Sequence, residues 1–282
     1  MRHLLRQRSS SSRTVTVDVG PQRLHVTVEN PGAGRPLLLI NGIGATGELF
    51  GPLRQHFTDR ETIAFDAPGV GESSTPWFPI TMRGIADIVA AMVRKLGHDH
   101  LDVFGLSWGG ALAQEFARRH PDIVRGLVLA ATMPGFPSVP GRPVAMSILL
   151  SPLRYYSPDY LRRVAPALYG GAIAEDPDLI AEHAKIRATR PPTPRGYLYQ
   201  LMAIQAWSSQ PWLHSLQAPT LVLAGDDDPI IPVINAKVMA ARIPDSRLEI
   251  LDGAGHLFMF LRSDETARRT KAFLDQPRLD AA

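Results

Sequence analysis

Three residues of this sequence carry side chains that could act together in nucleophilic catalysis: Ser107, Asp228 and His256. Each follows a short apolar run of the kind that forms a buried strand. A serine hydroxyl is a poor nucleophile unless a base removes its proton, and an imidazole can do so near neutral pH. A carboxylate can hold that imidazole in the required tautomer. The sequence therefore predicts acyl transfer, with Ser107 as nucleophile, His256 as base and Asp228 as orienting acid.

The surroundings of Ser107 predict a sharp turn between a strand and a helix. An apolar run ends at Phe104, and helical periodicity without a breaker begins at Ala111. Between them lies the pattern G-x-S-x-G, in which glycines at 105 and 109 avoid collisions at a strained serine. The same five residues could instead be a Gly/Ser-rich helix start in which the serine only caps the helix. The flanking strand and helix favour the nucleophile elbow.

Alternatives exist for the acid and for the base. Asp226 and Asp227 precede Asp228, and either could be the acid or a solvated turn residue. Asp228 is preferred because Pro229 restricts it to an extended conformation. His214 is the one serious rival to His256. Three further histidines near helix ends or turns are expected at the surface, namely His98, His100 and His120.

Acyl transfer also requires donors for the developing oxyanion. The main-chain N–H of Trp108 is expected to supply one, because it follows the nucleophile. The turn after the apolar run 37–40 is expected to supply the second donor, from the N–H of Ile43. The alternative is that this glycine-rich segment is a simple tight turn with no role in the site. No cofactor is expected. The acidic run 226–228 lacks a second ligand cluster with metal-like spacing, and no glycine-rich turn has P-loop or G-x-G-x-x-G spacing.

The elements that must position these residues alternate between strand and helix, which predicts an α/β fold with a mostly parallel sheet flanked by helices. An antiparallel hairpin is expected first, from strands 14–19 and 24–28. Further strands are expected at 37–40, 62–65, 101–104, 124–130, 220–224 and 248–251, with helices at about 82–96 and 263–274. The polar residues that follow these strands then meet at one edge of the sheet.

The pattern breaks between residues 133 and 211, where prolines are frequent and all six tyrosines lie. This segment is expected to form a helical lid that interrupts a hydrolytic core of residues 14–132 and 212–276. The lid as a whole is a candidate for substrate contact, and its individual tyrosines are expected to be core residues. Residues 1–13, which are basic and serine-rich, and residues 277–282 are expected to be tails.

Composition excludes several classes of protein. The 282 residues are 45% hydrophobic and 20% charged, with a net charge of +3, so nucleic acid is not an expected partner. Disulfides and thiolate sites are excluded because there is no cysteine. No run is long enough to span a bilayer, and the first residues lack the apolar stretch of a secretory signal. An organellar transit peptide would share their composition, but a disordered tail is preferred.

The sequence resembles the α/β-hydrolase superfamily from Thr14 to Leu274, including the chain order serine, aspartate, histidine. Within that superfamily it resembles intracellular depolymerases of medium-chain-length poly(3-hydroxyalkanoates). The segments that carry this likeness are 41–45, 65–71, 107–114, 169–171 and 221–229. The basic start of the chain belongs to no motif of that family.

This resemblance implies a serine hydrolase that cleaves ester bonds of a polyester stored in cytoplasmic granules, with Ser107, Asp228 and His256 as its triad. It implies a cytoplasmic location, with association with those granules left open. The first alternative keeps the triad but acts on a small soluble ester, a lactone or a carbon–carbon bond. The second is a ligand-binding protein that has kept the fold and lost turnover.

Overall fold

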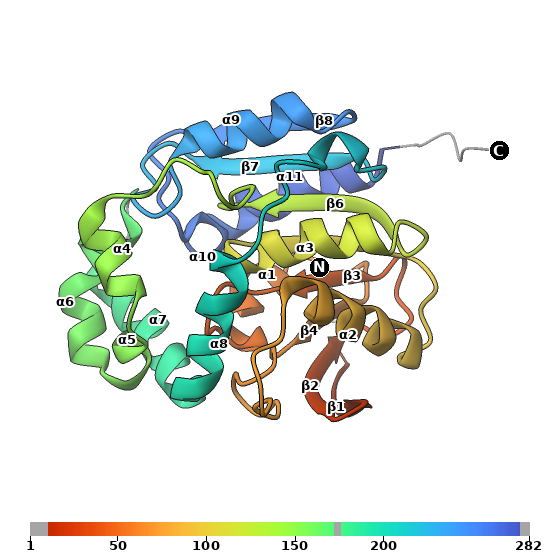
Figure 1. Cartoon of the computed structure of the whole chain (residues 1–282), viewed down its shortest axis with the longest axis horizontal. Helices are drawn as coiled ribbons and strands as arrows, with labels where there is room; N and C mark the ends of the chain where they lie inside the picture. The colour runs from red at the N-terminus through yellow and green to blue at the C-terminus, as the bar shows by residue number, and fades with distance from the viewer. Residues whose placement is uncertain (1–10, 172–175, 277–282) are drawn as a thin grey trace, which may run out of the picture.

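A computed structural model describes residues 11–171 and 176–276 of the chain. The tails expected at 1–10 and 277–282 lie outside the described residues. Figure 1 shows a central sheet covered by helices on both faces, with a group of helices at one end of the strands. Within the described residues, no helix is both long and apolar enough to cross a membrane.

The sheet has eight strands in the order β1-β2-β4-β3-β5-β6-β7-β8. Strand β2 pairs antiparallel with β1 and β4, and all the other pairs are parallel. The bounds are β1 Ser12–Val19, β2 Gln22–Glu29, β3 Leu37–Ile40, β4 Thr62–Phe65, β5 Leu101–Leu106, β6 Val124–Ala130, β7 Thr220–Gly225 and β8 Ser246–Leu251. The expected fold class is confirmed.

Helices cover both faces of the sheet and bury two apolar clusters against it. One cluster contains residues of α2 (Met82–Lys95), α3 (Trp108–Arg119) and α9 (Val233–Arg242). The other contains residues of η1 (Gly47–Phe50), α1 (Gly51–Arg54), α10 (Phe258–Leu261) and α11 (Ser263–Leu274). Strands β3, β4, β5 and β7 are buried at every residue, as expected for strands covered on both faces.

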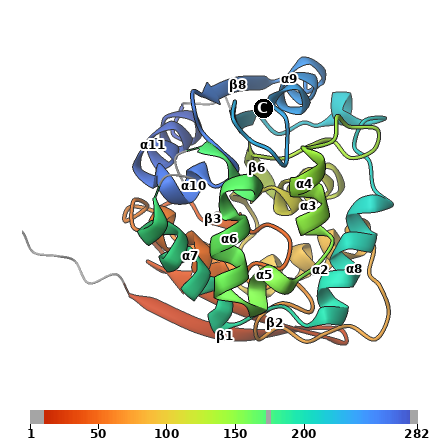
Figure 2. The same ribbon diagram turned by 90° about the vertical axis from the view of Figure 1, so that its left-hand side faces the viewer.

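The segment between β6 and β7 is helical and lies beyond the carboxyl ends of the strands (Figures 1 and 2). Its helices are α4 (Pro143–Leu149), α5 (Leu153–Tyr156), α6 (Pro158–Tyr169), α7 (Pro177–Thr189) and α8 (Pro194–Gln205), followed by η3 (Leu213–Ser215). Three of them start with a capping side chain and then a proline: Ser157-Pro158, Asp176-Pro177 and Thr193-Pro194. Several of the prolines that interrupt the sequence pattern therefore begin helices, whereas Pro166 lies inside α6. We call α4–α8 the lid.

Some boundaries differ from those expected. Ser12 and Arg13, expected in the tail, belong to β1 because they pair with Glu29 and Val28. Helices η1, α1, η3, α9 and α10 have no counterpart among the expected elements. The first two together are only eight residues long, and α9 begins directly after Pro232 in a segment without a regular apolar spacing.

Candidate active site

The turn that carries Ser107 has the geometry of a nucleophile elbow. Ser107 joins β5 to α3 with φ 55° and ψ −119°, a strained conformation for a residue other than glycine. A Cβ at Gly105 would lie 2.6 Å from the Ala113 Cβ, and one at Gly109 would lie 2.2 Å from the carbonyl oxygen of Ile40. Both positions therefore require glycine, and the serine hydroxyl stands at the amino end of the helix.

The structure brings Ser107, Asp228 and His256 together from three strand ends. The Oγ of Ser107 lies 3.0 Å from Nε2 of His256, and Nδ1 of His256 lies 2.7 Å from Oδ2 of Asp228. The other carboxylate oxygen of Asp228 accepts from the N–H groups of Ile230 (2.8 Å) and Ile231 (2.9 Å). Asp228 and His256 are 7% and 5% exposed. With Nδ1–H directed at the carboxylate, Nε2 can accept the serine proton.

The neighbouring aspartates have other partners. Asp226 accepts from the N–H of Gly253 at 2.6 Å, and Asp227 accepts from the N–H of Gly171 at 2.9 Å. Asp227 also forms an exposed ion pair with Arg142. Both side chains therefore hold loops near the histidine, and only Asp228 reaches the ring.

The rival histidines lie elsewhere. His214 is exposed on η3, and His100 is exposed near the end of α2. His98 and His120, expected at the surface, are half-buried because they bond to Glu61 and Asp87.

The two candidate oxyanion donors lie beside the serine. Ile43 and Trp108 line the same space as Ser107, and the Cβ of Ser107 lies 3.5 Å from an ideal Cβ on Gly42. Neither main-chain N–H donates to another group of the described residues. Asn41 holds the turn by donating to the carbonyl of Thr46 and accepting from the N–H of Gly42.

The lid holds this turn from above. The Tyr155 hydroxyl donates to the carbonyl of Ile43, and Oε1 of Gln200 accepts from the N–H of Gly44 at 2.7 Å. The carbonyl of Gln200 accepts from the indole N–H of Trp108 at 3.0 Å. Lid residues therefore hold the main chain of the turn at Ile43 and Gly44 and, on the other side of the nucleophile, the side chain of Trp108. The expectation that the tyrosines are core residues is incomplete for Tyr155, which also holds this turn, and wrong for Tyr156, which is 45% exposed.

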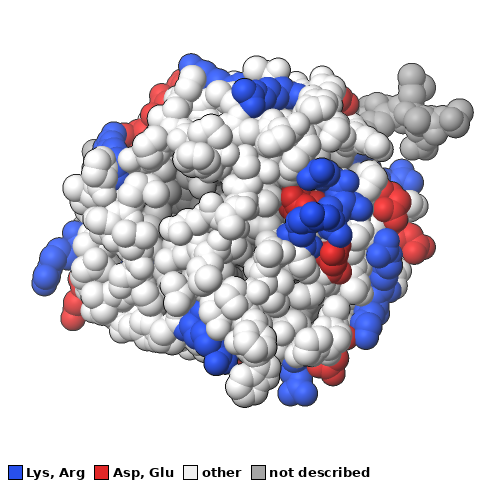
Figure 3. Space-filling view, viewed as in Figure 1, with Lys and Arg blue, Asp and Glu red and all other residues white. Residues whose placement is uncertain are grey.

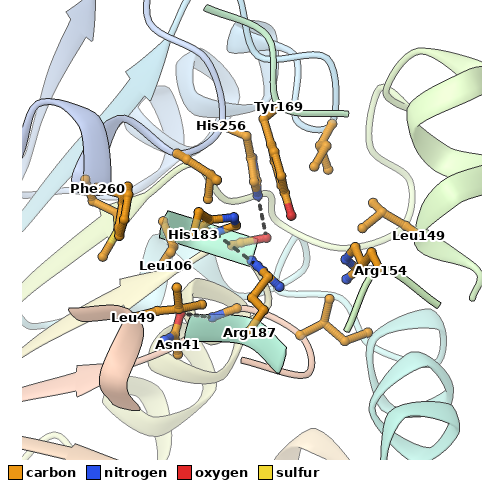
Figure 4. Close-up of a pocket in the computed structure, with 16 residues that line it drawn as sticks. Asn41, Leu49, Leu106, Leu149, Arg154, Tyr169, His183, Arg187, His256 and Phe260 are labelled. Carbon is orange, nitrogen blue, oxygen red and sulfur yellow. Dashed lines mark hydrogen bonds between the residues drawn. The ribbon is translucent and has the colours of Figure 1, made fainter. Parts of the chain in front are cut away.

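Two spaces meet at Ser107. The first, which we call the apolar groove, has a volume of about 310 Å³ and is lined by residues that include Trp108, Met133, Val139, Met146, Leu201 and Ile204. The second, which we call the arginine pocket, has a volume of about 30 Å³ and is shown in Figure 4. It contains His256 together with Arg154, Tyr169, His183 and Arg187.

The sequence analysis missed Arg154, His183 and Arg187. They lie on α5 and α7, and all three are at least nine-tenths buried. Burial, followed by the positive charges of Arg187 and Arg154, lowers the pKa of His183 well below its usual value. Burial raises the pKa of Tyr197, which contacts Arg154, to about 12. Arginine is ordinarily a surface residue, so nothing in the sequence pattern distinguishes these two.

This chain resembles known hydrolases. Residues 37–269 match the alpha/beta hydrolase family. The chain is 44% identical to a poly(3-hydroxyalkanoate) depolymerase of Ectopseudomonas oleovorans, over 98% of this chain and 94% of the relative.

Solved structures share the fold. A hydrolase from Pseudomonas aeruginosa is 22% identical, with a TM-score of 0.81 over 94% of this chain and 99% of the other. A thermophilic esterase from Thermogutta terrifontis is 25% identical, with a TM-score of 0.77 over 94% and 98%. The protein described here belongs to the alpha/beta hydrolase family and is a hydrolase.

Proposed function

We propose that this protein is a serine carboxylester hydrolase that cleaves poly(3-hydroxyalkanoates), with Ser107, Asp228 and His256 as its catalytic triad. The observation that carries the proposal is the hydrogen-bonded chain from Ser107 Oγ through His256 to Asp228, at the inner end of a large apolar groove. The likeness to the depolymerase of Ectopseudomonas oleovorans supports the choice of substrate.

The mechanism has two steps. Ser107 Oγ attacks the ester carbonyl while His256 Nε2 takes its proton, and the N–H groups of Ile43 and Trp108 stabilise the oxyanion. His256 then protonates the leaving alcohol. In the second step His256 activates water, which releases the acid from Ser107. Asp228 stabilises the imidazolium in both steps. These groups need no cofactor.

The apolar groove suits an acyl unit with an aliphatic side chain. Several of its residues are also exposed to solvent, including Phe136 (78%), Leu150 (64%) and Val139 (47%). Monomeric soluble proteins rarely expose contiguous apolar surface without a function. Figure 3 shows a hollowed region on one face whose visible surface carries almost no charged side chains.

These exposed apolar residues also support association with cytoplasmic polyester granules. A granule presents an apolar surface, and contact would deliver chain ends to the groove. Further large apolar side chains are exposed on α8 of the lid (Leu198 and Met202) and on the loop before α2 (Trp77 and Phe78). Tyr199 on α8 donates to the carbonyl of Trp77, which ties this loop to the lid.

The proposal is tested by hydrolysis with wild type and Ser107→Ala on two substrates, amorphous medium-chain polyhydroxyalkanoate granules and p-nitrophenyl esters. We expect release of hydroxyacids from granules by wild type only. Serine-dependent activity confined to the soluble esters would reassign the protein to small-molecule esters and overturn the polymer substrate. If a fluorophosphonate probe does not label the wild-type protein, and wild type hydrolyses neither substrate, the result would favour a ligand-binding protein.

A further inference from the structure

The arginine pocket holds two buried positive charges beside the nucleophile. Arg154 on α5 is 3% exposed and Arg187 on α7 is 8% exposed, and both line the same space as Ser107 and His256. In Figure 4 their guanidinium groups and the hydroxyl of Tyr169 point into that space. Burying a cation is costly unless an anion or several hydrogen bonds compensate for lost hydration.

Neither guanidinium has an anionic partner among the described residues. Arg154 Nη1 donates to the carbonyl of Ser151 (3.1 Å) and the hydroxyl of Tyr197 (2.7 Å), and Arg187 Nε donates to Nε2 of His183 (3.0 Å). Within residues 11–171 and 176–276, Nε of Arg154 and Nη1 of Arg187 have no hydrogen-bond partner. Each arginine therefore retains at least one buried N–H group without an acceptor.

The other two buried arginines of the described chain are paired differently. Arg54 lies 3.3 Å from a carboxylate oxygen of Glu29, and Arg60 lies 2.7 Å from one of Asp102. They show how this fold accommodates a buried guanidinium where the charge has only a structural role. Arg154 and Arg187 differ from them because neither has a carboxylate partner among the described residues.

Neutral groups surround the pair. The guanidinium carbon of Arg154 lies 4.8 Å from the ring centroid of Tyr155 and 5.2 Å from that of Tyr197. That of Arg187 lies 4.7 Å from Tyr155 and 5.7 Å from Tyr169. Ring faces compensate part of the cost of a buried cation but bring no negative charge.

Two further donors lie unpaired in the same pocket. His183 accepts from Arg187 through Nε2, so its proton lies on Nδ1, which has no partner among the described residues. The hydroxyl of Tyr169 also has none, and burial raises the pKa of this tyrosine, which keeps the hydroxyl protonated. The pocket therefore offers donors and positive charge without an acceptor to match them.

We propose that Arg154 and Arg187, with Tyr169 and His183, form a binding site for the free carboxylate at the end of a polyester chain. The volume of about 30 Å³ suits a group of a few atoms, since one water occupies about 10–15 Å³ on this measure. It does not suit an alkyl chain, which the apolar groove accommodates. Arginine binds carboxylates in a planar, two-point geometry.

The chemistry of the polymer fixes which unit carries this carboxylate. In a chain of 3-hydroxyacids, the unit acylating Ser107 has its only carboxyl group in the scissile ester. The free carboxylate therefore belongs to the leaving part of the chain, and because the arginine pocket borders Ser107 it must be that of the unit whose hydroxyl leaves. His256, which must protonate that alcohol, lines the arginine pocket and not the apolar groove. The carboxylate of the leaving unit thus lies on the side of the arginines, and the alkyl side chain of that unit must lie outside the arginine pocket.

This inference rests on the proposed function and specifies its direction: cleavage at the carboxyl end. The bond between the acyl carbon and the ester oxygen breaks, and the leaving oxygen takes the proton that His256 received from Ser107. One 3-hydroxyalkanoate anion departs. Water then hydrolyses the acyl-enzyme, and the shortened chain carries a new terminal carboxylate that can occupy the same site.

Binding tests the site without turnover. In the Ser107→Ala background, titration calorimetry compares a linear trimer of 3-hydroxyoctanoate with its methyl ester, which lacks the charge. We expect the free acid to bind at least about tenfold more tightly, as for a hydrogen-bonded ion pair. Adding Arg187→Gln or Arg154→Gln should abolish that preference. Arg163→Gln, an exposed arginine on α6, is the matched control and should retain it.

Hydrolysis separates this inference from the proposed function. Wild type should cleave the free acid with the higher kcat/KM and release a single unit first, whereas Arg187→Gln should treat acid and ester alike. Equal cleavage of both by wild type would overturn the carboxylate site and leave polyester hydrolysis standing. Tight binding of the acid without cleavage would overturn the polymer substrate alone. Arg187→Lys, which keeps the charge, serves if the glutamine variant does not fold.

Discussion

The main-chain N–H of His256 donates a 2.7 Å hydrogen bond to the carbonyl of Tyr169, the last residue of α6. The loop of the proposed catalytic histidine is therefore attached to the lid by its own backbone. Gly170 and Gly171 follow with φ 60° and 59°, and they let the two chains approach closely. A Cβ at Gly171 would lie 2.3 Å from the nitrogen of Gly255. Lid position and histidine position are thus coupled.

Gly171→Ala should therefore impair catalysis more than stability. The added methyl group must displace the loop before His256, and a displacement of about 1 Å can lower a rate by about 100-fold. We expect kcat on p-nitrophenyl octanoate to fall by about 10- to 100-fold, measured with thermal unfolding of the same samples.

Gly97→Ala is the matched control for this strain. Gly97 also has a positive φ, of 88°, but no atom lies within 4 Å of its ideal Cβ. It should lose about 1 kcal/mol of stability and keep its kcat. Equal losses of kcat in both variants would refute the coupling between lid and histidine.

The three consecutive aspartates should differ sharply on substitution. Asp228→Asn leaves the shape of the site but presents an amide to Nδ1 of His256, so we expect kcat to fall by about 10⁴-fold. Asp227→Asn removes only an exposed ion pair and a loop contact, and kcat should fall by less than about tenfold. Steady-state kinetics on one soluble ester decides the assignment. A larger loss for Asp227→Asn would move the acid to that residue.

Much of this architecture could be predicted from the sequence because its signals are local. The run Leu37–Ile40 is apolar at every position, and it forms a strand buried on both faces. The expected helix at 263–274 matches the bounds of α11. The elbow could be predicted because G-x-S-x-G is a local pattern between a strand and a helix, although the contact that requires Gly109 is with Ile40 of β3.

The arginine pocket could not be predicted in this way. Arg154 and Arg187 stand 33 positions apart on separate short helices, and only the packing of α5 against α7 brings them together. Their burial depends on the rings of Tyr155, Tyr169 and Tyr197, whose mutual placement no spacing rule gives. The same holds for the bond between Tyr169 and His256, which joins main-chain groups of two elements far apart in the sequence.

The apolar groove should set a preference for long acyl chains. Each buried methylene contributes about 0.8 kcal/mol, which corresponds to about fourfold in kcat/KM as an upper bound. From butyrate to octanoate, kcat/KM on p-nitrophenyl esters should rise with each methylene. Ile204→Trp should reduce the ratio of octanoate to butyrate because the indole fills part of the groove.

Leu198→Trp provides the control, since this residue is 53% exposed on the same helix and does not line the groove. Its chain-length profile should match that of wild type. If Ile204→Trp leaves the octanoate-to-butyrate ratio of kcat/KM unchanged, the acyl chain does not bind in the apolar groove.

His183 should make stability depend on pH. Burial and the charges of Arg187 and Arg154 lower its pKa in the fold, whereas in the unfolded chain it titrates near pH ~6.5. The unfolded state therefore binds more protons below that pH, and the free energy of unfolding must fall as pH decreases. The contribution is complete above pH ~7 and is lost at up to about 1.4 kcal/mol per pH unit below ~6.5. Tyr169, which also contacts this ring, is neutral throughout that range.

Urea unfolding of wild type and His183→Gln between pH 5 and 8, a window set by the titration near ~6.5, isolates this effect. Glutamine can still accept from Arg187 but does not titrate, so the difference in unfolding free energy should shrink by up to about 1.6 kcal/mol between pH 6.5 and 5, the range set by the titration near ~6.5. His214→Gln, at an exposed position, should follow the wild-type curve. If the curves of wild type and His183→Gln run parallel, burial and the charges of Arg187 and Arg154 do not hold His183 neutral in the fold. The positive field proposed to bind the substrate carboxylate would then lose this independent support.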